Sequence, residues 1–398
     1  MTETISKSIN SKIEEIKTEL LNKKLNKRND LSLMGGYIGE LLFYYSYCKH
    51  NEKTDYKIEE RVVYILNKII TSINRGYLYP TYSDGLAGIR WGIHFLNEHG
   101  FIEIEEDDSF DKIDEYLYKE MINFISVGNF DYLHGAMGIA IYFLGEVKKN
   151  KKYDEYVKDF IKQLLSKSVI LNNGIAWRNY SPKNNGDEFN LGLSHGIPSI
   201  INFLSKCTTE EVLIKETSSY LNGAVKFIME SKLKQKSVSI FSNFNSDIKP
   251  SRLAWCYGDL GIASSIWQAG IALYNEKWKE DAIQIMLHNT CRRDLETNGV
   301  HDAGLCHGTA GIAHIFNRFY KETKLKEFDD ARWYWLEQTL NFATHDKGLA
   351  GFKNWQGKEG WQNDYGLLEG VAGIGLMLLG FLSNDIEDLD WDRVLLLS

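Results

Sequence analysis

The stretch AGLCHGTAGIAHIF, residues 303–316, places a cysteine and a histidine directly before a glycine-punctuated segment that continues as an apolar run. Within that run Ile312, Ile315 and Phe316 recur at the i, i+3, i+4 spacing of one helix face. Two side chains that can bind a metal therefore stand at the start of a predicted buried helix. Similar stretches recur along the chain, and their spacing predicts the fold.

Seven segments carry Gly-x-x-Gly before an apolar run, except that the fourth has Ser199 in place of its second glycine. Their first glycines are Gly36, Gly85, Gly135, Gly196, Gly258, Gly308 and Gly370. A unit that recurs every 49 to 62 residues indicates a repeat architecture.

Amphipathic helical patterns lie between the glycine segments. One apolar stripe consists of Val62, Ile65, Leu66, Ile69 and Ile73. Another consists of Tyr153, Tyr156, Val157, Phe160, Ile161 and Leu164. Each unit is therefore predicted to be an outer amphipathic helix followed by an inner helix that is apolar nearly all round.

Seven such hairpins can close into an all-α fold, a double-layered α/α toroid whose inner helices begin at the glycines. The glycines then either let crowded helix ends approach one another or mark turns and caps. Residues 171–190, 232–251 and 345–365 are expected to form loops over one mouth, with a short hairpin arm at 237–244. No linker rich in proline or serine divides the chain, which predicts a single domain over residues 1–398.

The composition is that of a globular protein, with a net charge of −8 and 25% charged residues. No block of lysine and arginine indicates nucleic-acid binding, and the longest apolar stretch, residues 370–382, is too short to insert into a membrane. Five scattered cysteines and no apolar signal segment favour a reducing cytoplasm.

In a closed ring, equivalent repeat positions converge on one face. The residues directly before the first glycines of units two to seven are Asp84, His134, His195, Tyr257, His307 and Glu369. Cys256 and Cys306 precede two of them and share one register in neighbouring units. Because adjacent inner helices pack roughly 8–10 Å apart, two thiols at equal height can meet one ion.

Cys256, Cys306 and His307 thus form a candidate metal site whose thiolates and imidazole select zinc. Three protein ligands leave a fourth position open, as in catalytic sites. Two alternatives remain: a closed structural site completed by Cys291 or His301, or no metal, with the cysteines as small buried residues. An open zinc with two thiolates favours the ionisation and alkylation of an incoming thiol.

His195 and His134 are candidate general acids or bases, or else cap helices and bond within the core. Asp131 either caps a helix or orients a histidine. Arg252 either neutralises a developing enolate or lies on the surface. Tyr257 either donates a hydrogen bond to the same charge or packs as an aromatic wedge.

Asp84 and Glu369 are expected to interact with the positive ends of helices rather than to act in catalysis.

Together these residues resemble the lanthionine synthetase C (LanC) family of peptide cyclases. LSHGIPS, WCYGDLG and GLCHGTAG match three diagnostic stretches of the family in the right order. The glycine-headed helices extend the resemblance over almost the whole chain. The Cys-Tyr-Gly and Cys-His-Gly pair is its most specific part.

The resemblance implies an α/α toroid with zinc held by Cys256, Cys306 and His307. It also implies Michael-type addition of peptide cysteine thiols to dehydroalanine or dehydrobutyrine, which forms lanthionine and methyllanthionine thioether rings.

By motif match, His195 corresponds to the active-site histidine that protonates the enolate carbon, and Asp131 to an acidic residue near it. Arg252 and Tyr257 correspond to positions beside a zinc-binding cysteine. The division of acid and base roles among Asp131, His195 and Tyr257 stays open.

Family members act on a leader-bearing precursor peptide after a separate dehydratase, often in a complex with an exporter at the cytoplasmic membrane. The resemblance therefore implies a stand-alone cytoplasmic cyclase, peripheral to the inner face of the membrane through its partners. The chain departs from the family pattern at Ser199, and it shows no long insert of the kind that forms an accessory domain in some bacterial cyclases.

Two other functions share part of this pattern. One is a LanC-like scaffold that binds glutathione or another thiol without making rings. The other is a prenyltransferase-like zinc enzyme that alkylates a thiol. The second needs a carboxylate among its zinc ligands and a basic diphosphate pocket, and the predicted helix heads carry no cluster of arginine and lysine.

Overall fold

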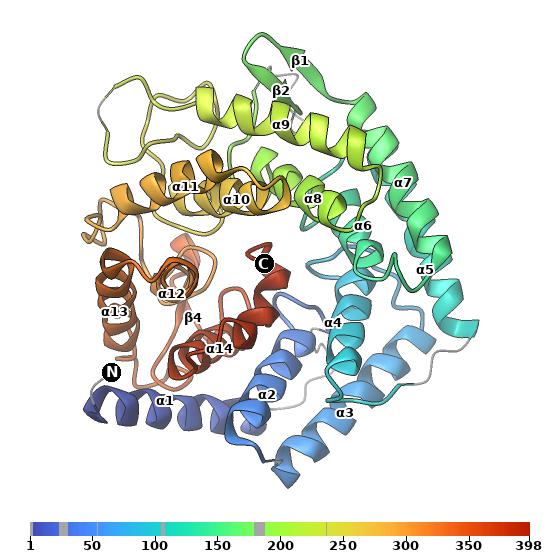
Figure 1. Cartoon of the computed structure of the whole chain (residues 1–398). Coiled ribbons are helices and arrows are strands. Elements are labelled where there is room, and N and C mark those ends of the chain that lie inside the picture. Colours follow the sequence, from blue (N-terminus) through green and yellow to red (C-terminus); the bar gives the residue numbers. More distant parts are fainter. Residues whose placement is uncertain (1–2, 24–30, 54, 105–107, 179–187, 236) are drawn as a thin grey trace. The chain divides into compact units, whose positions relative to one another are not determined.

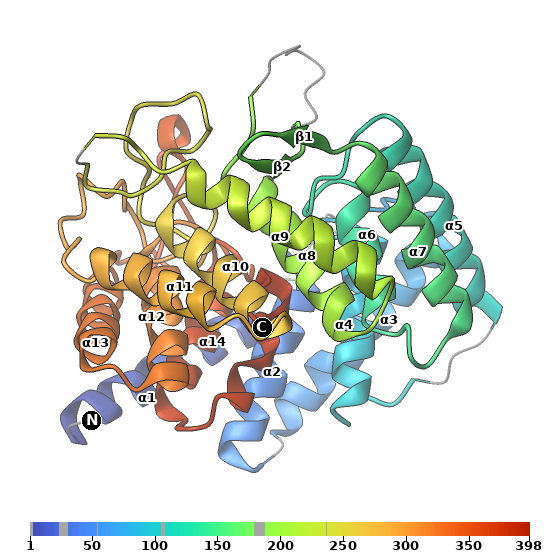
Figure 2. The same cartoon turned by 45° about the horizontal axis from the view of Figure 1, so that its top comes forward.

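The computed structural model describes residues 3–23, 31–53, 55–104, 108–178, 188–235 and 237–398. The chain forms two compact units. Figures 1 and 2 show the helices and strands of which they consist. The first comprises Met1–Glu105 and His301–Trp391, and the second comprises Glu106–Val300 and Asp392–Ser398. The single domain expected from the sequence stays a prediction.

The seven repeat glycines are the N-cap residues of seven helices. In the first unit these helices are α2 (Tyr37–Asn51), α4 (Leu86–Glu98), α12 (Thr309–Thr323) and α14 (Val371–Leu382). In the second unit they are α6 (Ala136–Leu144), α8 (Ile197–Thr209) and α10 (Asp259–Ala272). Every residue of α6 and all of α14 except Leu382 are buried, which confirms the predicted inner helices.

The remaining α-helices of the described chain bury one face and expose the other. They are α1 (Glu3–Asn22), α3 (Tyr56–Asn74), α5 (Asp108–Ser126), α7 (Lys151–Ser166), α9 (Ile214–Glu230), α11 (Glu276–Asn289) and α13 (Lys326–Asn341). The stripe predicted on α7 is wholly buried. On α3, Val62, Ile65 and Ile69 are buried, whereas Leu66 and Ile73 are half-buried.

The inner helices α8, α10 and α12 each pack on the outer helix that follows, whereas the sequence paired each inner helix with the outer helix before it; α6 packs on both α5 and α7. The packed pairs α8–α9, α10–α11 and α12–α13 lie side by side (Figure 1). Their connections are short, since α12 and α13 are separated only by residues 324–325. Short connections make antiparallel neighbours, whereas the long connections lead into the next inner helix.

Inner helices also pack on one another within each unit. In the first unit α2 contacts α4 and α14, and α14 contacts α12. In the second unit α8 contacts both α6 and α10. Consecutive glycine heads are therefore neighbours within a unit.

Strands are few in the described residues. β1 (Val169–Leu171) pairs antiparallel with β2 (Gly174–Ala176), and β3 (Asn354–Trp355) with β4 (Trp361–Gln362). The 3-10 helix η1 (Gly357–Glu359) joins β3 to β4, and η2 (Glu387–Leu395) follows α14. Of the predicted loop at 171–190, residues 179–187 lie outside the described chain.

The hairpin arm expected at 237–244 is wrong, because a side chain takes two backbone donors in the middle of the segment. The buried carboxylate of Asp259 accepts the N–H groups of Ile240 and Phe241 at 2.9 and 3.0 Å. Burial raises the pKa of Asp259, whose Oδ2 lies 3.5 Å from Nη1 of Arg292. The segment is therefore tied to the start of α10, and its strand pairing is limited to an isolated antiparallel bridge between Phe244 and Asn190.

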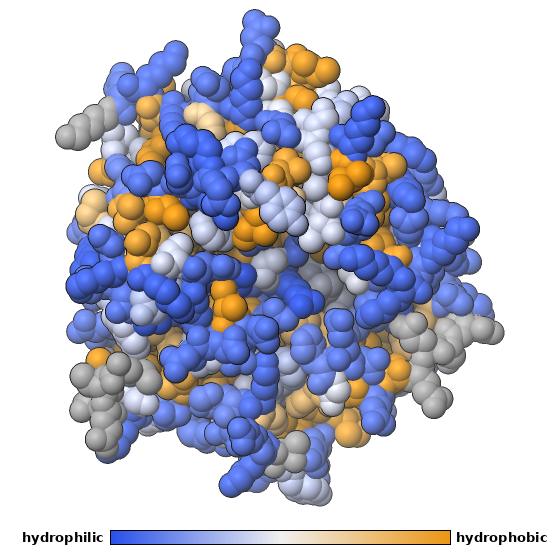
Figure 3. Space-filling view, in the orientation of Figure 1, coloured by the Kyte–Doolittle hydropathy of each residue, from blue (hydrophilic) through white to orange (hydrophobic). Residues whose placement is uncertain are grey.

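On the face shown in Figure 3, hydrophobic residues gather only in small groups among hydrophilic ones. Among the described residues, no helix combines the length and the apolar character needed to cross a membrane.

The second glycine of the motif is required by the loop that precedes its own helix. A Cβ on Gly311 would lie 1.9 Å from the carbonyl oxygen of Leu305, six residues earlier. At Gly373 the crowding comes from two repeats, because a Cβ there would lie 1.9 Å from the carbonyl oxygen of Leu367 in its own loop and 2.6 Å from the Leu305 side chain of the preceding repeat. Ser199, the exception, is buried and donates its hydroxyl to the Gly196 carbonyl at 2.7 Å.

We predict that Gly311→Ala lowers the free energy of unfolding by about 1–3 kcal/mol, since the loop must move to admit the methyl group. Gly145→Ala is the matched control, because Gly145 has a φ of −60° and its Cβ would make ordinary contacts from 3.5 Å outward. Urea unfolding of both variants measures the difference. Equal stability of the two variants would refute the close contact.

Candidate functional site

In the second unit, Asp131 and His195 form a hydrogen-bonded pair ahead of α6 and α8. His195 Nδ1 lies 2.7 Å from Asp131 Oδ2. The other oxygen of Asp131 accepts the backbone N–H of His134, also at 2.7 Å. Asp131 therefore both holds the turn before α6 and orients a histidine, which combines the two roles considered from the sequence.

Tyr257 lies beside this pair at the head of α10. Its ring centroid is 6.5 Å from that of His195, and its hydroxyl oxygen accepts a hydrogen bond from Asn190 Nδ2 at 3.0 Å. Burial raises the pKa of Tyr257, so the phenol keeps its proton through the neutral range. The next residue, Gly258, has a φ of +100°, a backbone conformation that favours glycine.

The other predicted residues of this unit differ in exposure. Cys256 is buried, and its carbonyl accepts the N–H of Ser194 at 3.3 Å. Arg252 is exposed, and its charge acts to lower the pKa of Tyr257. The exposed His134 stacks on His195, with 6.0 Å between ring centroids.

In the first unit, Cys306 and His307 form the head of α12. The N–H groups of Leu305 and Cys306 both donate to the Leu368 carbonyl, at 2.8 and 3.0 Å. His307 Nδ1 lies 3.5 Å from Oε1 of Glu369, which precedes the N-cap of α14. Glu369 was expected only to interact with a helix end, but it pairs with the candidate metal ligand.

Asp302 completes this group. His307, Glu369 and Asp302 offer ligand atoms that all lie within 4.8 Å of one another. Asp302 is buried, and its two oxygens accept the N–H groups of Gly304 at 3.0 Å and Trp355 at 2.9 Å. Asp302 thereby joins the loop before Cys306 to the β3–β4 hairpin.

Sequence analysis missed Asp302 and its equivalents. In four of the sequence repeats, the side chain six positions before the first glycine accepts the backbone N–H of the residue two positions further along. These residues are Asn129, Asn190, Asp302 and Asp364. Such a turn uses one side-chain oxygen and leaves the second polar atom for other contacts. The recurrence of Asn or Asp at this register was the signal that could have found them.

The two residues weighed as a fourth zinc ligand are both exposed. The Cys291 thiol donates to the His288 carbonyl, with a sulfur–oxygen distance of 3.2 Å. His301 directly precedes Asp302.

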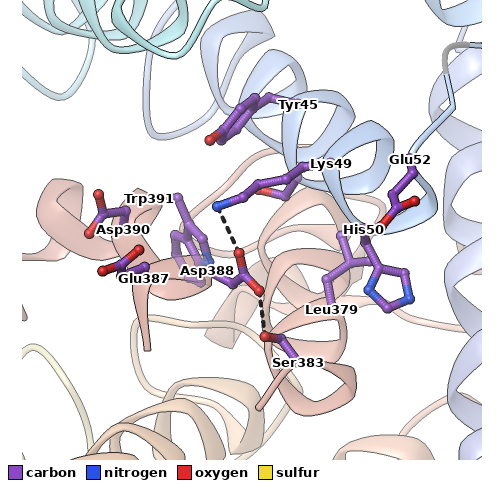
Figure 4. A pocket seen from close by; sticks show the side chains of 11 residues that line it. Tyr45, Lys49, His50, Glu52, Leu379, Ser383, Glu387, Asp388, Asp390 and Trp391 are labelled. Carbon is purple, nitrogen blue, oxygen red and sulfur yellow. Dashed lines mark hydrogen bonds and ion pairs between the residues drawn. The ribbon is translucent and has the colours of Figure 1, made fainter. Parts of the chain in front are cut away.

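A separate cavity of about 240 Å³ lies in the first unit, at the C-terminal ends of α2 and α14 (Figure 4). Lys49 forms a 2.7 Å ion pair with Asp388 there, and Asp388 accepts the Ser383 hydroxyl. The glycine heads are at the other ends of these helices, and none of the predicted site residues lines this cavity.

Comparison with known proteins defines the class. Residues 27–396 match the family described as lanthionine synthetase C-like protein, and the chain belongs to that family. It is 26% identical to the nisin biosynthesis protein NisC of Lactococcus lactis subsp. lactis over 94% of this chain and 91% of that protein. The solved structure of nisin cyclase matches with a TM-score of 0.72 and 22% identity, over 100% of this chain and 98% of that one.

The likeness to nisin cyclase confirms the predicted fold class, an all-α toroid of helical hairpins. Family membership confirms the predicted enzyme class, a lanthionine cyclase.

We predict that Asp131→Asn switches the tautomer of His195. The His134 N–H holds the amide oxygen in place, so the new Nδ2 faces His195 Nδ1 and donates to it. The ring proton then moves from Nδ1 to Nε2, which imidazole nitrogen chemical shifts report. The control His134→Gln keeps the wild-type tautomer, and an unchanged tautomer in Asp131→Asn would contradict the pairing.

Proposed function

We propose that this protein is a zinc-dependent lanthionine cyclase acting on a dehydrated precursor peptide. It joins cysteine thiols to dehydroalanine or dehydrobutyrine and forms lanthionine or methyllanthionine. The observation that carries the proposal is the Asp131–His195 pair beside Tyr257, at the heads of three consecutive inner helices. Family membership and the likeness to NisC support the substrate class.

Zinc is assigned to Cys256, Cys306 and His307. Two thiols and an imidazole are a donor set that suits zinc, and the two cysteines occupy one register at the heads of α10 and α12. The carboxylate of Glu369 beside His307 also fits, because ring nitrogens of ligating histidines commonly bond a carboxylate. When bound, zinc supplies the positive charge that lowers the pKa of the peptide thiol.

The reaction forms one C–S bond and one C–H bond, breaks the S–H bond of the thiol, and converts a C=C bond into a single bond. The thiol sulfur attacks the β-carbon, its proton leaves to solvent, and the π electrons move toward the carbonyl to give an enolate. The α-carbon then takes a proton. Neither an oxidant nor a reductant is needed, so proton transfer and charge stabilisation are the tasks left to side chains.

We assign the carbon protonation to His195. Asp131 holds Nδ1, which leaves Nε2 to exchange a proton with the substrate. The Tyr257 hydroxyl donates a hydrogen bond to the enolate oxygen, and the positive charge of Arg252 stabilises the negative charge on that oxygen. Removing one such donor costs a factor of about 10²–10³ in other enzymes.

The chemistry also defines the partners. A separate dehydratase must first convert serine or threonine of the leader-bearing precursor, and we propose that a membrane exporter receives the cyclised product. None of the five cysteines forms a disulfide, which agrees with a reducing cytoplasm as the site of action.

The function is tested with a synthetic peptide that holds one dehydrobutyrine and one cysteine. Ring closure leaves the mass unchanged but removes the free thiol, so mass spectrometry after iodoacetamide treatment counts the rings. We expect zinc-loaded protein to protect the thiol well beyond the enzyme-free rate. Thiol labelling equal to the enzyme-free control would refute the cyclase, and glutathione binding without rings would favour a scaffold.

We predict that Cys306→Ala loses zinc and ring formation together, whereas His195→Asn keeps zinc and slows ring formation by about 10²–10⁴-fold. Elemental analysis of the purified proteins measures the metal. Cys291→Ser is the control and keeps one zinc per chain. Zinc at full stoichiometry in Cys306→Ala would count against the ligand set, and its loss from Cys291→Ser would indicate a closed structural site.

A further inference from the structure

Asn190 lies six residues before Gly196 and is 2% exposed. Its Oδ1 accepts the Gly192 N–H at 2.7 Å, and its Nδ2 donates to the Tyr257 hydroxyl at 3.0 Å. The backbone donor decides which way the amide points, because a flipped amide would set its NH₂ group against the Gly192 N–H. The Tyr257 oxygen is therefore the acceptor in its bond with Asn190.

A phenol that accepts one hydrogen bond still has its own proton to donate. Among the described residues, no hydrogen bond donated by the Tyr257 hydroxyl is found. His195, the assigned proton donor, is its aromatic neighbour at 6.5 Å. Asn190 thus donates to the Tyr257 hydroxyl oxygen and leaves the hydroxyl proton for a substrate.

We propose that Asn190 is a positioning residue of the cyclase, which sets the Tyr257 hydroxyl as a hydrogen-bond donor to the substrate enolate. This inference rests on the proposed function. Asn190 acts through Tyr257 and does not itself touch the reacting atoms.

The repeat register explains why an amide is needed at this position. Asp302 and Asp364 make the same turn with a carboxylate oxygen, so the turn alone accepts either residue type. A carboxylate at position 190 would keep the Gly192 bond but would have only acceptors to offer. Tyr257 would then donate its proton to residue 190 instead of the substrate.

The test is Asn190→Asp, which preserves the turn and reverses the second hydrogen bond. We expect kcat for ring closure of the dehydrobutyrine peptide to fall about 10–100-fold, with little change in KM or melting temperature, because the bond to the enolate exists only in the transition state. Asp364→Asn, the reverse exchange in an equivalent turn, is the control and keeps the wild-type rate.

A double-mutant cycle shows whether the effect passes through Tyr257. Once Tyr257→Phe has removed the hydroxyl, adding Asn190→Asp should change kcat less than about threefold. If the kcat loss of the double variant equals the product of the two single losses, the inference is overturned. A wild-type kcat in Asn190→Asp would also overturn it.

A second measurement does not depend on activity. The side-chain NH₂ protons of Asn190, followed by NMR, should shift in Tyr257→Phe, because the phenol oxygen that accepts from Nδ2 is lost. An unchanged amide signal would show that Asn190 serves the turn alone. If wild-type protein makes no rings, the proposed function fails, while this signal still shows whether Asn190 bonds the Tyr257 hydroxyl.

Discussion

The close approach of backbone to backbone at the start of α2, α4, α10, α12 and α14 is the constraint on which the candidate site depends. The loop that enters the helix folds back so that a carbonyl rests on the second glycine, as Leu305 does on Gly311. Cys306 and His307 lie between these two points, so their places at the head of α12 follow from the contact. The bonds from Leu305 and Cys306 to the Leu368 carbonyl then tie this head to the next one. Two candidate metal ligands and the turn that carries them are thus set by the same glycine.

Polar side chains around the candidate site each make two contacts, one within a turn and one outside it. Asp131 holds a backbone turn with one oxygen and His195 with the other. Asn190 and Asp302 divide their polar atoms in the same way, between their own turn and a partner outside it. A side chain fixed by a backbone N–H has little freedom left, so its second contact is well oriented without further support. The same turn recurs in four repeats, and the choice of Asn or Asp decides whether the second polar atom donates or accepts a hydrogen bond.

Much of the fold was predictable because it is written in local patterns. The seven glycines identified seven helix starts, and the stripe from Tyr153 to Leu164 identified a buried helix face. Two expectations were wrong for non-local reasons. Connection length, not chain order, decided which outer helix packs on α10, and the carboxylate of Asp259 took two donors in the middle of the strand expected at 237–244. Asn190 and Asp302 escaped notice because they precede the glycine motif and are common turn formers.

The sequence by itself determined the repeat, the inner and outer helix classes and the shared register of Cys256 and Cys306. These follow from periodicity, which is a property of order along the chain. Only the tertiary structure decided that Asp131 meets His195, that Glu369 faces His307 and that Asn190 donates to Tyr257. Each of these contacts joins residues of different repeats, and its geometry depends on how neighbouring helix heads pack, which no local pattern encodes.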